Sequence, residues 1–281
     1  MKTRSIVLTL LLGLGPLVTI QLGCDEHKYD NELAEAAAAA SASAAAAASA
    51  KAAMAALASA VASAAPAPTW TRKNAADCKP HPATIDFTDQ PGLEKEVRKK
   101  ASKDTGPITP ADLAQIKSIN VTSAKIHQID PCIFPMFTSL KGCFLGAGDY
   151  DDLTPLQKLT GLQDLNVSTS QVKDLHAIEG LKQLDRLDLS HTLIGDDQLK
   201  SVASLVNLTE LTLDETGITD ITPLSALTKL TLLSIKKTNV SSLAPISGIK
   251  TLKKLYIAGS NVTDITPVQA ATASGLKIFS Q

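Results

Sequence analysis

One pattern recurs seven times between residues 116 and 281. Each copy opens with the phrase apolar-x-x-apolar-x-apolar, and successive copies begin 22 or 24 residues apart. A unit of this length cannot bury an apolar face alone, so consecutive units must stack and share one core. The sequence therefore predicts a solenoid of seven coils. The opening residues are Ile116, Leu140, Leu162, Leu184, Leu208, Leu230 and Leu252.

The positions inside each unit predict the path of a coil. Positions 1, 4, 6, 11, 14, 17 and 20 are mostly apolar. Positions 4 and 6 have the period of a strand, so positions 3, 5 and 7 face solvent. Proline at position 16 suits the start of a short helical turn, and aspartate at position 13 suits a turn. The prolines are Pro131, Pro155, Pro223, Pro245 and Pro267, and the aspartates are Asp152, Asp174, Asp220 and Asp264.

The fifth unit reads LTELTLDETGITDITPLSAL over residues 208–227. This motif resembles the 22-residue leucine-rich repeat of internalin-like bacterial proteins, and the resemblance covers about 60% of the chain. It implies an α/β solenoid, a right-handed coil with a parallel β-sheet on its concave face. The family has asparagine at position 9, which bonds the backbone between coils. Here five units have serine or threonine, and the first two have Ala124 and Gly148. We expect the fold to survive and the first two coils to be less regular.

The N-terminus has the layout of an export signal. Lys2 and Arg4 precede an uncharged run over residues 6–20. A helix of that length spans roughly 22 Å, which is short of the ~30 Å hydrocarbon core of a membrane. Gln21, Leu22, Gly23 and Cys24 follow the run and resemble the cleavage box of bacterial lipoproteins, where the cysteine is acylated, although the box usually has leucine at the position of Gln21. We expect residues 1–23 to be a signal peptide and Cys24 to anchor the protein to a bacterial membrane, on its periplasmic side or at the cell surface. The alternative is an ordinary signal peptide with an unlipidated cysteine.

Residues 24–77 are predicted to be a spacer rich in alanine and serine. Alanine favours helix, and residues 31–65 would form a rod of about 52 Å. The spacer is either helical or disordered. Met54, Leu57 and Val61 share one helical seam, so self-association into a homo-oligomer through residues 31–65 is also open.

Residues 78–115 are predicted to be a helical N-terminal cap, because a solenoid needs a terminal unit that shields its first coil. Thr109, Pro110 and Asp112 indicate the start of a helix: an N-cap, a proline at N1 and an acidic residue in the first turn. The basic run at 98–103 is interpreted as the solvated face of the cap. This stretch resembles the cap of internalin-like proteins.

Three cysteines remain after Cys24. In an oxidising compartment a pair is plausible, and the sequence favours Cys132 with Cys143, which it places inside neighbouring coils. A disulfide from Cys78 to either of these cysteines is the first alternative, and buried free thiols without a disulfide are the second.

The sequence carries no motif typical of catalysis. It contains no H-E-x-x-H, G-x-S-x-G or P-loop pattern, and Cys78 and His81 have metal-like spacing without a second pair. We therefore expect no enzyme, no cofactor and no metal site. A net charge of −1 removes the electrostatic reason to expect nucleic acid.

The outward row of the strands, on the concave face, is the predicted binding site. Solenoids use such rows for recognition, with exposed aromatic residues as anchors. The alternative is that these charges only keep the sheet soluble. We expect a protein or glycan partner, or else a structural envelope protein that self-associates through its alanine-rich rod. The candidate residues are Phe144, Asp164, Arg186, Asp188, Glu210, Asp214, Lys236, Lys254 and Tyr256.

Overall fold

The computed structural model describes residues 72–79 and 82–281. The predicted signal peptide, Cys24 and the alanine-rich tract lie outside these residues, so the predictions for them stay predictions. The chain divides into two units, Met1–Thr69 and Trp70–Gln281. Everything below concerns the second unit.

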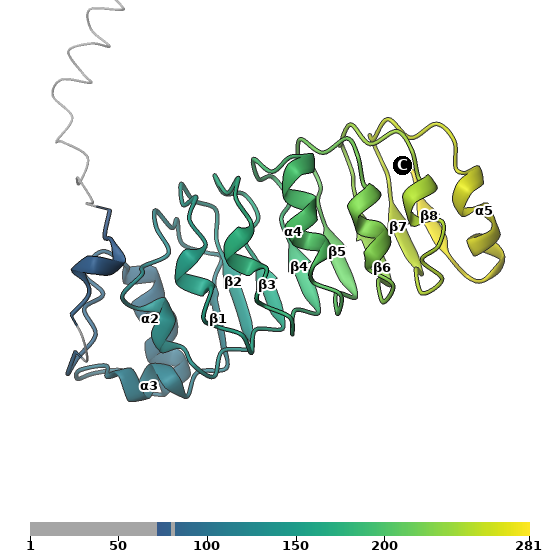
Figure 1. Ribbon diagram of the computed structural model, residues 1–281. Helices are drawn as coiled ribbons and strands as arrows, with labels where there is room; N and C mark the ends of the chain where they lie inside the picture. Colours follow the sequence, from purple (N-terminus) through teal and green to yellow (C-terminus); the bar gives the residue numbers. More distant parts are fainter. Residues whose placement is uncertain (1–71, 80–81) are drawn as a thin grey trace, which may run out of the picture. The chain divides into compact units, whose positions relative to one another are not determined.

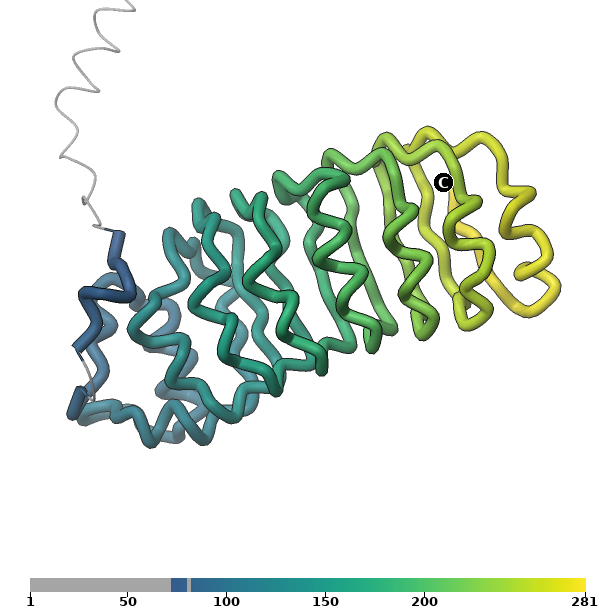
Figure 2. The backbone as a smooth tube through the Cα atoms, viewed as in Figure 1, coloured from purple at the N-terminus to yellow at the C-terminus, as the bar shows by residue number. Residues whose placement is uncertain are grey.

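The second unit is a solenoid built on one parallel sheet. Its eight strands follow one another in chain order, and each pairs in register with the next. Short helices and turns lie on the other side of the strands (Figures 1 and 2). This arrangement confirms the predicted fold class. The strands are β1 (Ser118–Val121), β2 (Gly142–Leu145), β3 (Asp164–Asn166), β4 (Arg186–Asp188), β5 (Glu210–Thr212), β6 (Leu232–Ser234), β7 (Lys254–Tyr256) and β8 (Lys277–Phe279).

Short helical segments after β1 return each coil to the next strand. The α-helices are α2 (Pro91–Ala101), α3 (Pro110–Ala114), α4 (Leu199–Ala203) and α5 (Thr266–Ala273). The 3-10 turns are η1 (Ala75–Asp77), η2 (Phe134–Met136), η3 (Thr154–Leu156), η4 (His176–Ile178), η5 (Asp196–Gln198), η6 (Thr222–Ala226) and η7 (Ala244–Ile246). Of these helices and turns, η1, α2 and α3 precede β1.

The predicted proline and aspartate positions act at the starts of these segments. Pro155, Pro223, Pro245 and Pro267 lie in the first turns of η3, η6, η7 and α5, whereas Pro131 precedes η2. Each position-13 aspartate accepts a hydrogen bond from the backbone N–H two residues later. The N···O distances are 2.8 Å from Thr154, 2.9 Å from His176, 2.8 Å from Thr222 and 2.8 Å from Thr266.

The repeated apolar positions form one continuous core. All seven opening residues are buried, from Ile116 at 4% exposed to Leu184 at 0%. Positions 4 and 6 of all seven repeats are buried too, as with Leu211 and Leu213, whereas Ile278 on the terminal strand β8 is partly buried. Each coil covers the apolar face of its neighbour, which no single coil could do alone.

The turn after each strand shows how the coils are bonded without the asparagine that the family has at position 9. In coils three to seven the position-9 hydroxyl donates to the position-6 carbonyl of its own coil, over 2.6–2.8 Å. Backbone groups join the coils instead, because the position-8 N–H donates to the next coil, as from Glu215 to the Lys236 carbonyl at 2.9 Å. Position 8 has a left-handed conformation in these coils, at Thr169, His191, Glu215, Lys237 and Gly259.

The first two coils differ at this turn. Neither Ser123 nor Ala147 at position 8 has a positive φ. Gly148 instead forms a parallel bridge with Ile126, and a Cβ on Gly148 would lie 1.8 Å from the Ile126 carbonyl oxygen. The backbones of these two coils therefore approach so closely that position 9 of the second coil requires glycine.

Replacing Gly148 by alanine is expected to lower the free energy of unfolding by about 2–3 kcal/mol, because backbone must move to admit the methyl group. Gly248→Ala is the matched control. A Cβ there meets nothing within 4 Å, so stability should be unchanged or slightly raised. Urea unfolding followed by circular dichroism measures both, and equal midpoints for the two variants would refute the close approach.

α3 begins at the predicted N-cap, and Thr109 and Asp112 form a capping box there. Asp112 Oδ2 accepts from the Thr109 N–H at 2.7 Å, the Thr109 hydroxyl at 2.8 Å and Lys103 Nζ at 3.0 Å. These contacts, the Thr109 backbone N–H above all, lower the pKa of Asp112 to about 2. The basic run at 98–103 is thus partly paired inside the cap, where Arg98 also contacts Glu94 at 2.8 Å.

Asp112→Asn is expected to reduce stability by about 1 kcal/mol at pH 7 and by much less near pH 2. The pKa of Asp112 is lowered in the folded protein, so its contribution is full above the ordinary carboxyl pKa of 3.8 and is lost as pH falls toward 2. Melting temperatures of both proteins between pH 7 and pH 2 test this. Asp104→Asn, at an exposed position, is the control. A difference in melting temperature between Asp112→Asn and the native protein that is as large at pH 2 as at pH 7 would contradict a stabilising role for the Asp112 carboxylate.

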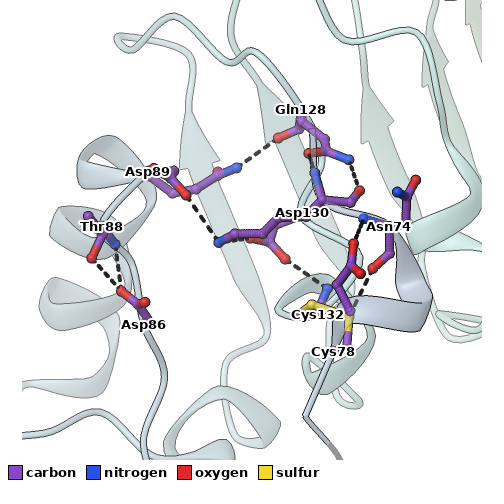
Figure 3. A network of polar contacts seen from close by, with 11 residues as sticks. Asn74, Cys78, Asp86, Thr88, Asp89, Gln128, Asp130 and Cys132 are labelled. Carbon is purple, nitrogen blue, oxygen red and sulfur yellow. Dashed lines mark hydrogen bonds and ion pairs between the residues drawn. A yellow bond between two sulfur atoms is a disulfide. The ribbon is translucent and has the colours of Figure 1, made fainter. Parts of the chain in front are cut away.

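Residues 72–78 are part of the cap, although the sequence places 72–77 in the spacer. Lys73 forms ion pairs with the buried Asp130 at 3.1 Å and with Asp89 at 3.3 Å (Figure 3). Its backbone N–H donates to Gln128 Oε1 at 2.9 Å, and Gln128 Nε2 donates back to the Lys73 carbonyl at 2.6 Å. Arg72 reaches the second coil, where it pairs with Asp151 at 2.9 Å. This segment is therefore held on the first two coils.

The favoured disulfide between Cys132 and Cys143 is wrong. Cys132 bonds Cys78, with a Cα–Cα distance of 5.1 Å (Figure 3). Cys143 is free and fully buried. Cys143 lies on β2, whereas Cys132 lies at the return side of the first coil, beside η2. Positions 4 and 17 line opposite sides of the core, beyond the ~7 Å that a disulfide can span. The segment before α2 brings Cys78 to Cys132 instead.

Candidate binding surface

The solvent-facing side chains of β1–β8 at positions 3, 5 and 7 are called the strand face below. The strand register aligns them in rows, because every residue lies opposite its equivalent in the next coil. The position-3 row reads Ser118, Gly142, Asp164, Arg186, Glu210, Leu232, Lys254 and Lys277. The position-5 row reads Asn120, Phe144, Asn166, Asp188, Thr212, Ser234, Tyr256 and Phe279.

The structure places all nine candidate residues on this face, but they are not equally accessible. Arg186 and Lys254 are exposed, and most of the others are half-buried. Asp214 is buried at 8% exposed, because it accepts bonds from the Ser234 hydroxyl at 2.6 Å and the Lys236 N–H at 2.8 Å. Asp214 therefore holds β5 to β6 and offers little to a partner.

Ion pairs neutralise part of the face. Arg186 pairs with Asp164 on the adjacent strand, and this contact raises the pKa of the guanidinium. Lys236 Nζ pairs with Asp214 at 3.0 Å. These cross-strand pairs stabilise the sheet modestly.

Four other charged groups of the face have no ion-pair partner among the described residues: Asp188, Glu210, Lys254 and Lys277. The two carboxylates lie on β4 and β5, and the two lysines lie on β7 and β8. A partner would meet these free charges first.

Aromatic side chains lie toward both ends of the face. Phe144 is half-buried on β2 beside Gly142, whose absent side chain leaves room for the ring. Tyr256 and Phe279 stack with ring centroids 4.5 Å apart, and Lys236 Nζ lies 6.0 Å from the Tyr256 centroid. Stacked rings of this kind make a rigid apolar platform.

Sequence reasoning missed Lys277 and Phe279 as site residues. The last strand belongs to no complete unit, so the repeat pattern marks the outward positions only through the seventh coil. The signal available was the alternation Leu276-Lys277-Ile278-Phe279, which repeats the strand pattern of the earlier coils. β8 extends the face by one strand.

Reactive chemistry is not assembled among the described residues. No group of histidine, cysteine and carboxylate side chains in this part of the chain could hold a metal ion. Burial raises the pKa of the Cys143 thiol well above its usual range, which disfavours the reactive thiolate. In residues 72–79 and 82–281 no helix has the length and apolarity needed to cross a membrane.

No protein-family model matches the chain, and no curated protein matches it in sequence. Solved structures do match. Internalin C2 of Listeria monocytogenes is 28% identical with a TM-score of 0.60, over 68% of this chain and 93% of that one. The internalin inlF of the same organism is 26% identical with a TM-score of 0.61, over 67% of this chain. A leucine-rich-repeat protein of Leptospira interrogans is 19% identical with a TM-score of 0.51, over 61% of this chain.

These matches support an internalin-like leucine-rich-repeat domain. The chain spans only 55% and 51% of the lengths of the last two proteins, whereas it spans nearly all of internalin C2. The Leptospira protein shows the shared fold alone. No enzyme family is indicated by these neighbours.

Proposed function

We propose that this protein is exported, anchored to a bacterial membrane through Cys24, and binds a protein partner through the strand face without catalysing a reaction. The observation that carries the proposal is the row of in-register polar and aromatic side chains on an eight-stranded sheet. Rigid solenoid sheets of this kind offer extended binding surfaces. The likeness to two internalins supports a protein-binding role.

The disulfide supports export. Cys78 and Cys132 are 54 residues apart in sequence and are bonded, and such bonds persist in oxidising compartments. An extracytoplasmic location would meet that requirement, as would delivery by the predicted signal peptide. Cys24 lies outside the described residues, so lipidation needs its own test.

Anchoring is tested by replacing Cys24 with serine. The native protein is expected in the membrane fraction and to incorporate labelled palmitate, whereas the variant is expected to incorporate none. Labelling of both proteins to the same extent would remove the anchor from the proposal. Cys143→Val is the control, since that buried thiol has no role in the anchor.

Binding is tested by capturing envelope proteins with the full chain and with a strand-face variant. The variant changes Asp188, Glu210, Lys254 and Tyr256 to alanine, and leaves Asp214 intact because that carboxylate supports the sheet. Asp197 and Lys158, exposed on the helical side, are changed in the control. A specific partner should be lost with the strand-face variant alone. Equal recovery of every protein with both variants would refute use of this face.

A glycan partner is the other class that the sequence leaves open. Glycan arrays probed with the same two variants would detect it. Self-association through residues 31–65 would instead make the protein structural. Analytical ultracentrifugation of the chain with and without those residues separates this alternative, because it alone requires the tract for oligomers.

A further inference from the structure

We propose that the partner of the strand face is a protein surface with segregated charge: a basic group seated over β4 and β5, and an acidic group seated over β7 and β8. This inference rests on the proposed function and goes beyond it by specifying the chemistry of the partner. Three observations carry it: which charges are already paired, where the free ones lie, and what lies between them.

The acidic end of the face consists of Asp188 and Glu210. Arg186 lies opposite Glu210 in the register and interacts with its charge, but its ion pair is with Asp164 on the other side, so neither Asp188 nor Glu210 has a salt bridge to it. The Asp188 carboxylate is held in place by Asn166 Nδ2 at 3.0 Å and by the Ser190 N–H at 3.0 Å. A carboxylate fixed in this way suits a lysine or arginine side chain.

The basic end consists of Lys254 and Lys277, which lie opposite each other in the register of β7 and β8. Both are exposed, and the rows of β6–β8 contain no carboxylate that could pair with them. The stacked rings of Tyr256 and Phe279 lie beside them on the same strands. This end suits an acidic side chain next to an apolar one.

The two ends lie about three strand steps apart, or roughly 14 Å at ~4.8 Å per step. Leu232 lies between them, directly between Glu210 and Lys254 in the position-3 row, and it is only half-buried. Along the strand order, free carboxylates on β4 and β5 are therefore followed by the apolar Leu232 on β6 and then by free lysines on β7 and β8. A polyanion would be repelled at one end, and a polycation at the other.

The probe is a fluorescein-labelled peptide with three lysines, a four-residue spacer containing leucine, and three glutamates. A peptide of identical composition with alternating lysine and glutamate is the matched control probe. Fluorescence anisotropy is read with the full chain in a mild non-ionic detergent at low salt. We expect the segregated peptide to bind at least threefold more tightly than the alternating one, with the difference shrinking at high salt.

Variants locate the two ends. Asp188→Asn with Glu210→Gln, or Lys254→Gln with Lys277→Gln, should each weaken the segregated peptide at least threefold. Reversing one end with Asp188→Lys and Glu210→Lys should abolish its preference. Reversing both ends, with Lys254→Glu and Lys277→Glu added, should restore binding, because the peptide can turn around. Lys158→Gln with Asp197→Asn on the helical side should change nothing, and unchanged circular dichroism confirms that each variant folds.

Equal binding of the two peptides to all these proteins would overturn the segregated-charge proposal. If the strand-face variant still loses a partner in the capture experiment, the proposed function stands without the segregated-charge proposal. If that variant captures every protein as well as the native chain does, both the proposed function and the segregated-charge proposal are refuted. Sedimentation would also overturn the proposal if it showed a salt-sensitive dimer that Lys254→Gln with Lys277→Gln converts to monomer. The strand face would then bind a second copy of this chain.

Discussion

Replacing Cys78 by serine is expected to lower the free energy of unfolding by about 4 kcal/mol. The bond to Cys132 joins residues 54 apart, and its loss frees the unfolded chain to explore that loop. The remaining attachment of residues 72–78 is polar: the Lys73 pairs with Asp89 and Asp130, and the Arg72 pair with Asp151. The exposed pair of Arg72 with Asp151 contributes at most about 1 kcal/mol, whereas Lys73 also pairs with the buried Asp130.

Cys143→Val is the control for this prediction. Cys143 occupies a core position that is leucine or isoleucine in the other coils, so a small apolar residue should cost little there. Urea unfolding in non-reducing buffer measures both variants, and dithiothreitol should lower the stability of the native protein to that of Cys78→Ser. A large loss for Cys143→Val with none for Cys78→Ser would instead favour a bridge from Cys132 to Cys143.

Leu211→Ala is expected to cost about 3–4 kcal/mol. Leu211 is fully buried on β5, in the core between coils four and six, and truncation leaves a cavity that neighbouring coils cannot readily fill. Because each coil contacts only its neighbours, hydrogen exchange should increase most in β4–β6.

Leu193→Ala supplies the matched control, since the same side chain is removed at a position 60% exposed. Its effect should lie within about 0.5 kcal/mol. Similar losses for the two leucines, measured by urea unfolding, would contradict the assignment of the repeated leucines to one interior.

The path of each coil could be predicted because every position of the repeat occurs seven times in the sequence. Leu187 and Leu211 occupy the same repeat position and are both buried, so assigning one of them to the surface would disagree with the other repeats. The position-13 aspartates were predictable for a local reason, since the N–H that each accepts lies two residues away. Contacts set by a few neighbouring residues are visible in one sequence.

Other features depend on contacts between distant segments. The position of Cys78 is set by how residues 72–78 lie on the first coils, and no periodicity describes that segment. The burial of Asp214 depends on its bonds to the next strand, so a strand pattern alone marked it as exposed. The first two coils were expected to be irregular, and Gly148 shows the cause: a close approach of backbones.

The central claim is that the strand face, and not the helical side, touches a protein. A photo-crosslinking amino acid placed at Thr212 on β5 and, separately, at Lys158 beside η3 tests it most directly in producing cells. The account predicts a covalent adduct to a protein from Thr212 and none from Lys158. Adducts from Lys158 alone would contradict it.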